Sequence, residues 1–153
     1  FELATTKARG VLPFKVTIAD AVYNISRTSL LTAALSTGRL DLIRTAMQDR
    51  LHQPYRAALV PGMEKLLAEA PTRGALGIAL SGAGPTLLAL VDRQETRKDE
   101  LEAFLLETMQ EQGITAQTRW LNPCITGVQT ELLDRNEMQS DSFLDMIKGE
   151  IRS

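Results

Sequence analysis

Two glycines and a proline interrupt two apolar runs in the segment "LSGAGPTLLAL", residues 80–90. The runs "GALGIAL" and "TLLALV" on either side are short and almost continuously apolar, which is typical of strands buried on both faces. Glycine and proline between such runs predict a sharp turn. The segment therefore predicts two core strands, joined by a turn at residues 81–86.

Helical periodicity surrounds this strand pair. We expect Asp20 and Asp41 to be the N-caps of two consecutive helices that form a helical hairpin. Gly38 lies where the first helix should end, and Pro54 should close the second. The segments with a helical pattern are 21–38, 42–53, 62–70 and 95–113.

A further strand is predicted for "ITAQTRWL", residues 114–121, because its side chains alternate strictly between two faces. Residues 1–5, "FELAT", also have the composition of a strand, and "VQTELL", residues 128–133, is a further candidate. Helices followed by strand, turn, strand, helix and strand predict an α+β fold. We expect a ferredoxin-like sandwich, with a mainly antiparallel sheet and the helices on one face.

The chain of 153 residues is long enough for one domain, which we expect over residues 1–131. Residues 132–153 form a polar tail in which a short amphipathic helix is expected. The sequence begins at Phe1 rather than at a methionine, and we expect it to be a piece of a longer protein.

Charge and cysteine content exclude several classes of partner. A net charge of -2 gives no basic field for nucleic acid, and no apolar run is long enough to span a membrane. The single Cys124 cannot form an internal disulfide and fits a reducing compartment. We therefore expect a cytoplasmic protein that binds neither nucleic acid nor membrane.

The turn at residues 81–86 has two interpretations. Its glycines would let backbone N–H groups converge on an anion, and the hydroxyls of Ser81 and Thr86 could add hydrogen bonds. Alternatively, the turn is only a tight strand connection. It lacks the lysine of a P-loop and the glycine spacing of a dinucleotide-binding motif.

Three polar side chains, His52, Tyr55 and Arg56, lie around Pro54. A guanidinium at Arg56 could bind a carboxylate or phosphate with two parallel hydrogen bonds. Equally, His52 could cap a helix end while Arg56 is solvated. Arg9 has the same two interpretations, and a lone arginine in a loop is usually solvated.

Taken together, four segments resemble the C-terminal half of the homoserine kinases, which belong to the GHMP kinase superfamily together with galactokinase and mevalonate kinase. They are "TTKARGVLP", "DAVYNISR", "AMQDRLHQPYRAALVPG" and "GALGIALSGAGPTLLAL". The resemblance covers residues 1–128. "LSGAGPT" is similar to the third motif of the superfamily, whereas the first and third segments are similar to homoserine kinases in particular.

The resemblance implies transfer of the γ-phosphoryl group of ATP to the side-chain hydroxyl of L-homoserine, giving O-phospho-L-homoserine for threonine biosynthesis. Magnesium would accompany the ATP. It implies that Arg9 and Arg56 hold the carboxylate of homoserine and that Thr5 lies near it. It also implies a loop beside the nucleotide and substrate, formed by Ser81, Gly82, Ala83, Gly84, Pro85 and Thr86.

The phosphate-binding loop of the superfamily and its acidic residue belong to an N-terminal ATP-binding domain, and nothing in this sequence matches them. We therefore expect no catalytic residue and no metal ligand here, and neither ATP nor magnesium bound by this chain alone. The expected partners are L-homoserine and that N-terminal domain, and a homodimer is left open. The alternatives are a free-standing sensor domain of the same fold, or another small-molecule kinase of the superfamily.

Overall fold

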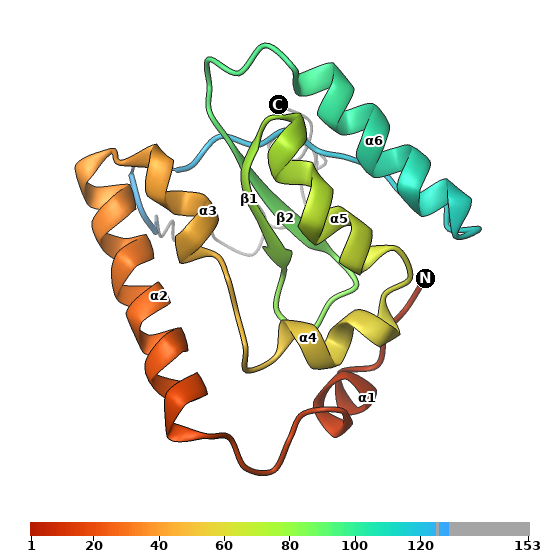
Figure 1. The fold of residues 1–153 in the computed structure, drawn as a ribbon. Helices are drawn as coiled ribbons and strands as arrows, with labels where there is room; N and C mark the ends of the chain where they lie inside the picture. The colour runs from red at the N-terminus through yellow and green to blue at the C-terminus, as the bar shows by residue number, and fades with distance from the viewer. Residues whose placement is uncertain (125, 129–153) are drawn as a thin grey trace, which may run out of the picture. The chain divides into compact units, whose positions relative to one another are not determined.

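A computed structural model describes residues 1–124 and 126–128 (Figure 1). The chain divides into two compact units, Phe1–Thr118 and Arg119–Ser153. Short 3-10 turns at Leu40–Leu42, Ala57–Leu59 and Ala70–Arg73 connect some of the helices of the first unit. Its helices and strands are α1 Thr5–Gly10, α2 Ile18–Thr37, α3 Ile43–Ala46, α4 Gln53–Arg56, α5 Met63–Glu69, β1 Ala75–Leu80, β2 Leu87–Val91 and α6 Lys98–Glu111.

The predicted strand pair is present, and its strands run antiparallel. Leu80 pairs with Leu87 at the end of the ladder, so residues 81–86 form the connecting loop of a hairpin. Ile78 pairs with Ala89, and both pack into the core between the sheet, α5 and α6. Both apolar runs are therefore strands, but only β1 is a core strand. The prediction of a second core strand is wrong, because no residue of β2 is fully buried and Leu88 is 53% exposed.

Both faces of the sheet meet helical segments, as Figure 1 shows for α3 and α5. On one face, Leu66 of α5 and Leu101 of α6 pack with Ile78, and both leucines are almost fully buried. The other face is covered by Met47, directly after α3, and a Cβ added to Gly77 would meet its Sδ at 2.5 Å. The expectation of helices on one face only is therefore wrong for the described residues.

Helix α2 begins earlier than predicted. Thr17 is its N-cap, and its hydroxyl accepts a hydrogen bond from the Asp20 backbone N–H at 3.0 Å and donates one to the Asp20 carboxylate at 2.6 Å. Asp20 is thus the third helical residue, which binds the capping hydroxyl, and not the N-cap itself. Gly38 ends the helix in the left-handed conformation, with φ of 69°, as predicted.

The single helix expected over residues 42–53 is wrong. The structure has the four-residue α3, then a turn, and then the four-residue α4. The carboxylate of Asp49 accepts hydrogen bonds from the backbone N–H groups of Leu51, His52 and Gln53, which competes with helix continuation. Pro54 lies in the first turn of α4, where its missing N–H costs nothing, so it starts a helix and does not close one.

The strands predicted at residues 114–121 and 1–5 are not formed among the described residues. In 114–118 the predicted alternation is nevertheless present, because Ile114 and Ala116 pack against the core while Thr115 and Gln117 are exposed. Residues 1–4 have no regular structure, and Thr5 begins α1. An extended segment becomes a strand only when a neighbouring strand accepts and donates its backbone hydrogen bonds. The ferredoxin-like order of strands is accordingly not seen in this part of the chain.

In the second unit, residues 119–124 and 126–128 form neither helix nor strand. Cys124 is exposed there, and a hydrogen bond with the Thr126 hydroxyl lowers the pKa of its thiol. The predicted tail helix at residues 132–153 and most of "VQTELL" lie outside the described residues.

Candidate functional site

The loop Ser81–Thr86 is held at its base by the sheet. The Ser81 N–H donates to the Thr86 carbonyl at 2.8 Å, and the Gly84 N–H donates to the Ser81 carbonyl at 3.0 Å. Gly82 and Gly84 have φ of 59° and 83°, a conformation that side chains rarely adopt, and the peptide bond from Gly84 to Pro85 is cis. The two glycines are therefore required by the path of the backbone.

Several polar groups of this loop remain available. Ser81, Gly82 and Thr86 are exposed. Among the residues that the structure describes, no hydrogen bond is formed by the hydroxyls of Ser81 and Thr86 or by the backbone N–H groups of Gly82 and Ala83. A Cβ added to Gly82 would have no atom within 4 Å. The tip of the loop thus offers donors and free space to a ligand, which a strand connection alone does not need.

Helix α1 carries two of the predicted residues. Thr5 is its first residue and Arg9 lies in its last turn, and both side chains are exposed. Only Ala8 of this helix is buried. The guanidinium of Arg9 forms no hydrogen bond or ion pair with the described residues 1–124 and 126–128. Arg9 can therefore reach a ligand without giving up an existing partner.

Arg56 is different, because its side chain is buried, with 9% of the residue exposed. It lies at the end of α4, where Nε donates to the Ala8 carbonyl at 3.0 Å and Nη1 donates to the Gly82 carbonyl at 2.7 Å. The interpretation of Arg56 as a solvated charge is therefore wrong, whereas its role in binding a ligand stays a prediction. Within the described part of the chain Nη2 has no hydrogen bond, so this nitrogen can still bind a ligand.

Arg56 therefore brings three predicted segments together: α1, α4 and the loop Ser81–Thr86. Thr5 and Arg9 form no hydrogen bond with that loop among the described residues, so the connection runs through Arg56. Beneath it, Ala57, Val60, Met63 and Leu80 form an apolar cluster that supports α4 and the base of the loop. Arg56 is thus a buried cation that fixes α1 and the loop Ser81–Thr86, and Arg9 is an exposed cation on α1.

Sequence reasoning missed two polar residues of this region. Gln53 is buried, and its Oε1 accepts a hydrogen bond from the Leu80 N–H at 2.9 Å, at the end of β1. Asp49 has 7% of its side chain exposed and binds the backbone N–H groups that start α4. The N-cap of α4 is His52, whose side chain forms no cap, so the usual signal of an aspartate directly before a helix could not have identified Asp49.

The His52 side chain has little part in these contacts. Its Nε2 lies 3.8 Å from Asp49 Oδ2, and its buried Nδ1 has no hydrogen-bond partner among the residues that the structure describes. Tyr55 is exposed. The predicted helix cap by His52 is therefore not formed by its side chain, since it is the His52 backbone that lies at the start of α4.

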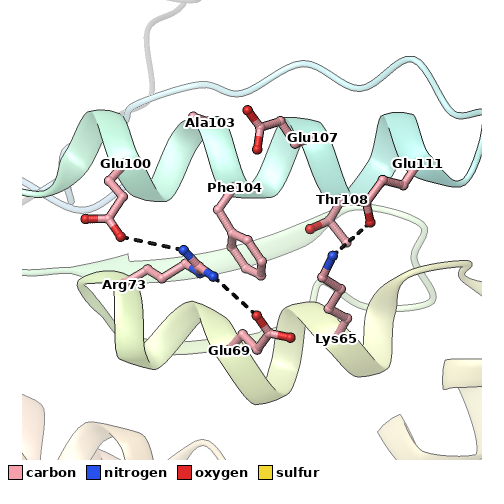
Figure 2. A pocket seen from close by; sticks show the side chains of 9 residues that line it. All are labelled: Lys65, Glu69, Arg73, Glu100, Ala103, Phe104, Glu107, Thr108 and Glu111. Carbon is pink, nitrogen blue, oxygen red and sulfur yellow. Dashed lines mark hydrogen bonds and ion pairs between the residues drawn. The ribbon is translucent and has the colours of Figure 1, made fainter.

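A separate groove lies between α5 and α6 (Figure 2). Lys65 and Glu111 form an ion pair across it at 2.8 Å, and Arg73 lies over the Phe104 ring, 4.3 Å from its centre. Arg73 also bridges Glu69 at 3.4 Å and Glu100 at 3.6 Å. None of the predicted site residues lines this groove. Its charged side chains pair with one another across two packed helices, and such exposed pairs add little stability.

Comparison with known proteins identifies the family to which the chain belongs. Residues 31–111, which include α4 and the loop Ser81–Thr86, match the family described as "GHMP kinases C terminal". The chain belongs to this family. In the part of the chain that the structure describes, no helix is both long enough and apolar enough to cross a membrane. The same residues contain no group of three or more His, Cys, Asp or Glu side chains that could hold a metal.

Curated relatives of this GHMP kinase sequence are homoserine kinases. It is 48% identical over 122 residues to the homoserine kinase of Nostoc punctiforme, covering 80% of this chain and 40% of that protein. It is 50% identical over 115 residues to that of Deinococcus radiodurans, covering 75% and 37%. With the homoserine kinase of Persephonella marina, identity is 41% over 134 residues, covering 88% and 44%. The chain thus spans less than half the length of these relatives.

A solved structure shows a similar fold. The crystal structure of homoserine kinase from Cytophaga hutchinsonii matches with a TM-score of 0.59 and 30% identity, covering 72% of this chain and 34% of that one. The likeness therefore extends from sequence to backbone.

Proposed function

We propose that the chain is the substrate-binding part of a homoserine kinase. The whole protein would transfer the γ-phosphoryl group of ATP to the hydroxyl of L-homoserine, giving O-phospho-L-homoserine for threonine biosynthesis in the cytoplasm. Support comes from the identity of 41% to 50% with homoserine kinases over 115 to 134 residues. A second domain, found in the additional length of those relatives, would bind the nucleotide.

The observation that carries the proposal is the position of Arg56. It joins α1 to the glycine loop while Nη2 stays unused, and Arg9 is exposed on the same α1. Two arginines on segments that are joined by hydrogen bonds suit a small ligand with a carboxylate, because a guanidinium forms charge-assisted hydrogen bonds in a fixed direction. We assign the carboxylate of homoserine to Arg9 and Arg56, with Thr5 beside it.

The loop Ser81–Thr86 would face the phosphate groups and the reacting hydroxyl. Its available N–H groups at Gly82 and Ala83 and its hydroxyls suit an anion. ATP thus fits this part of the site. We assign no magnesium ligand to the described residues, because they contain no group of three or more His, Cys, Asp or Glu side chains that could hold a metal. When bound, ATP and magnesium supply the transferable phosphoryl group and its charge compensation.

The test is a substrate panel with the full-length protein that contains this chain. ADP release is measured with L-homoserine, galactose, mevalonate and phosphomevalonate, each at saturating ATP. Selective phosphorylation of homoserine, with the product identified by mass spectrometry, supports the proposal. Selective turnover of another compound would reassign the protein within the superfamily, and binding of homoserine without turnover would support a sensor. Light scattering of the same sample measures whether the protein is a dimer.

A further inference from the structure

The Asp49 carboxylate is nearly buried and lies between α2 and α4. Its Oδ1 accepts hydrogen bonds from the Leu51 N–H at 3.0 Å and from the side-chain amide of Asn24. Its Oδ2 accepts from the His52 N–H at 2.9 Å and from the Gln53 N–H. Among the described residues, no lysine or arginine forms an ion pair with this carboxylate, and the imidazole Nε2 of His52 lies 3.8 Å from Oδ2. The carboxylate is therefore held mainly by hydrogen bonds from N–H groups.

Asn24 makes this contact specific. Its Nδ2 donates to Asp49, and its Oδ1 accepts the Arg50 N–H at 2.9 Å. The amide therefore uses its donor and its acceptor on neighbouring residues of one turn. This ties the turn to the long helix α2, which is twenty residues from Ile18 to Thr37.

Helix α4 depends on such ties because it has only four residues, too few to be stable alone. Each end of the helix is attached to the site. Gln53 binds the Leu80 N–H at the end of β1, and Arg56 binds the carbonyls of Ala8 and Gly82. Any shift of α4 would move Arg56 and loosen both segments.

We propose that Asp49 is a positioning residue for the homoserine site: through α4 it holds Arg56 between α1 and the loop Ser81–Thr86. It does so without touching the substrate. This inference rests on the proposed function, since it concerns the binding of the same substrate.

The negative charge is essential to this role. Four N–H donors converge on the two oxygens of Asp49. An asparagine in its place has a single acceptor oxygen, and its NH₂ would face N–H groups. The variant Asp49→Asn keeps the size of the side chain but leaves donors unpaired, so α4 should lose its fixed orientation.

The experiment compares Asp49→Asn with Leu101→Ala in the full-length protein. Leu101 is fully buried in a core cluster with residues of α5 and β1, and none of the predicted site residues belongs to that cluster, so its truncation lowers stability generally. We expect Asp49→Asn to raise the KM for homoserine at least tenfold while the KM for ATP changes less than about threefold. Leu101→Ala should lower the melting temperature and leave the homoserine KM within about twofold of wild type.

Hydrogen exchange measured by mass spectrometry adds a readout that does not depend on activity. In Asp49→Asn, peptides covering residues 5–11 and the loop 81–86 should exchange faster, whereas in Leu101→Ala they should not. If Asp49→Asn does not fold, Asn24→Ala, which removes one of the four donors, takes its place with an expected rise of about threefold in homoserine KM.

The outcomes are distinguishable. A wild-type protein that does not phosphorylate homoserine overturns the proposed function and this inference with it. An active wild type whose homoserine KM rises no more in Asp49→Asn than in Leu101→Ala overturns the positioning role alone, as does unchanged exchange of both peptides.

Discussion

At the scale of single residues, the two predicted arginines have different environments. Arg56 is buried and binds two backbone carbonyls, whereas Arg9 is exposed on α1 without a described partner. A substitution of Arg56 therefore changes the structure of the site as well as any contact with a ligand. A substitution of Arg9 should change only the contact with a ligand.

We predict that Arg9→Ala raises the KM for homoserine about tenfold or more in the full-length protein, without a change in the free energy of unfolding. A charge-assisted hydrogen bond contributes about 1.5 to 3 kcal/mol, and its loss should appear in substrate binding. Steady-state kinetics and urea unfolding measure the two quantities. Lys7→Ala on the same helix is the matched control, and an Arg9 variant that behaves like it would leave Arg9 as a solvated charge.

We predict that Arg56→Lys lowers the free energy of unfolding by about 2 kcal/mol although it keeps the charge. A lysine ammonium cannot reproduce the planar guanidinium that binds Ala8 and Gly82 together, so a buried carbonyl loses its donor. Urea unfolding of the full-length protein measures this loss. Arg44→Lys, an exposed arginine on α3, should have no effect. Equal stability of the Arg56→Lys variant and wild type would show that the buried hydrogen bonds contribute nothing.

The pKa of Asp49 predicts how stability depends on pH. Burial alone raises this pKa, but the hydrogen bonds from Asn24 and from the Gln53, His52 and Leu51 backbones outweigh it and bring the pKa below its ordinary value of 3.8. A carboxyl with a lowered pKa stabilises the fold above its unfolded-state pKa, and this contribution is lost as the pH falls through the folded-state pKa.

Below about pH 4, the free energy of unfolding should therefore fall more steeply in wild type than in Asp49→Asn. Urea titrations of the full-length protein from pH 7 to pH 3 measure the two slopes. Asp99→Asn, an exposed carboxylate in the first turn of α6, controls for the change in charge. Parallel curves for wild type and Asp49→Asn would contradict the prediction.

At the scale of elements, the two glycines of the hairpin loop, Gly82 and Gly84, differ in the space around them. A Cβ at Gly84 would lie 2.9 Å from Leu80 Cδ1, inside the support of the loop. A Cβ at Gly82 would point into open space. Both positions have a positive φ, so both substitutions are strained, but only one of them fills space that a ligand could use.

We predict that Gly82→Ala lowers kcat/KM for homoserine at least tenfold, about 1.4 kcal/mol, while its free energy of unfolding falls by only about 1 kcal/mol. Gly84→Ala should show the larger loss of stability because it adds a close contact to the same backbone strain. Kinetics and urea unfolding of both variants in the full-length protein measure this. If activity falls only in proportion to stability in both, the loop is a strand connection and nothing more.

At the scale of the whole molecule, the chain spans 37% to 44% of the length of the relatives compared above. Phosphoryl transfer needs positioned phosphate groups and metal charge. We propose that residues in the additional length of those relatives supply part of this machinery.

We predict that the chain of residues 1–153 alone does not phosphorylate homoserine, whereas the full-length protein does. ADP release is measured for both at equal concentration, with a no-protein control. Mixing the chain with the separately produced N-terminal part tests whether activity returns. Turnover by the chain alone, in a preparation free of the longer protein, would show that it holds a complete catalytic site.

The sequence by itself determined the strands flanking the glycine loop, the ends of α2 and α5 near Gly38 and Pro71, and the identity of the segments that resemble a kinase. These features depend on neighbouring residues: an apolar run, a glycine with positive φ, a proline. Only the tertiary structure decided which residues are buried. Ile18, Val22 and Ile25 form an apolar stripe on α2, yet all three are more than half exposed.

The tertiary structure also decided the roles of Asp49 and Arg56. The helix predicted over residues 42–53 is interrupted at Asp49, because the carboxylate of this residue binds three N–H groups of the following turn. Arg56 acquired carbonyl partners 48 and 26 residues away, at Ala8 and Gly82. Periodicity and local motifs contain no information about such distant partners, because the contacts exist only once the strands and helices have packed.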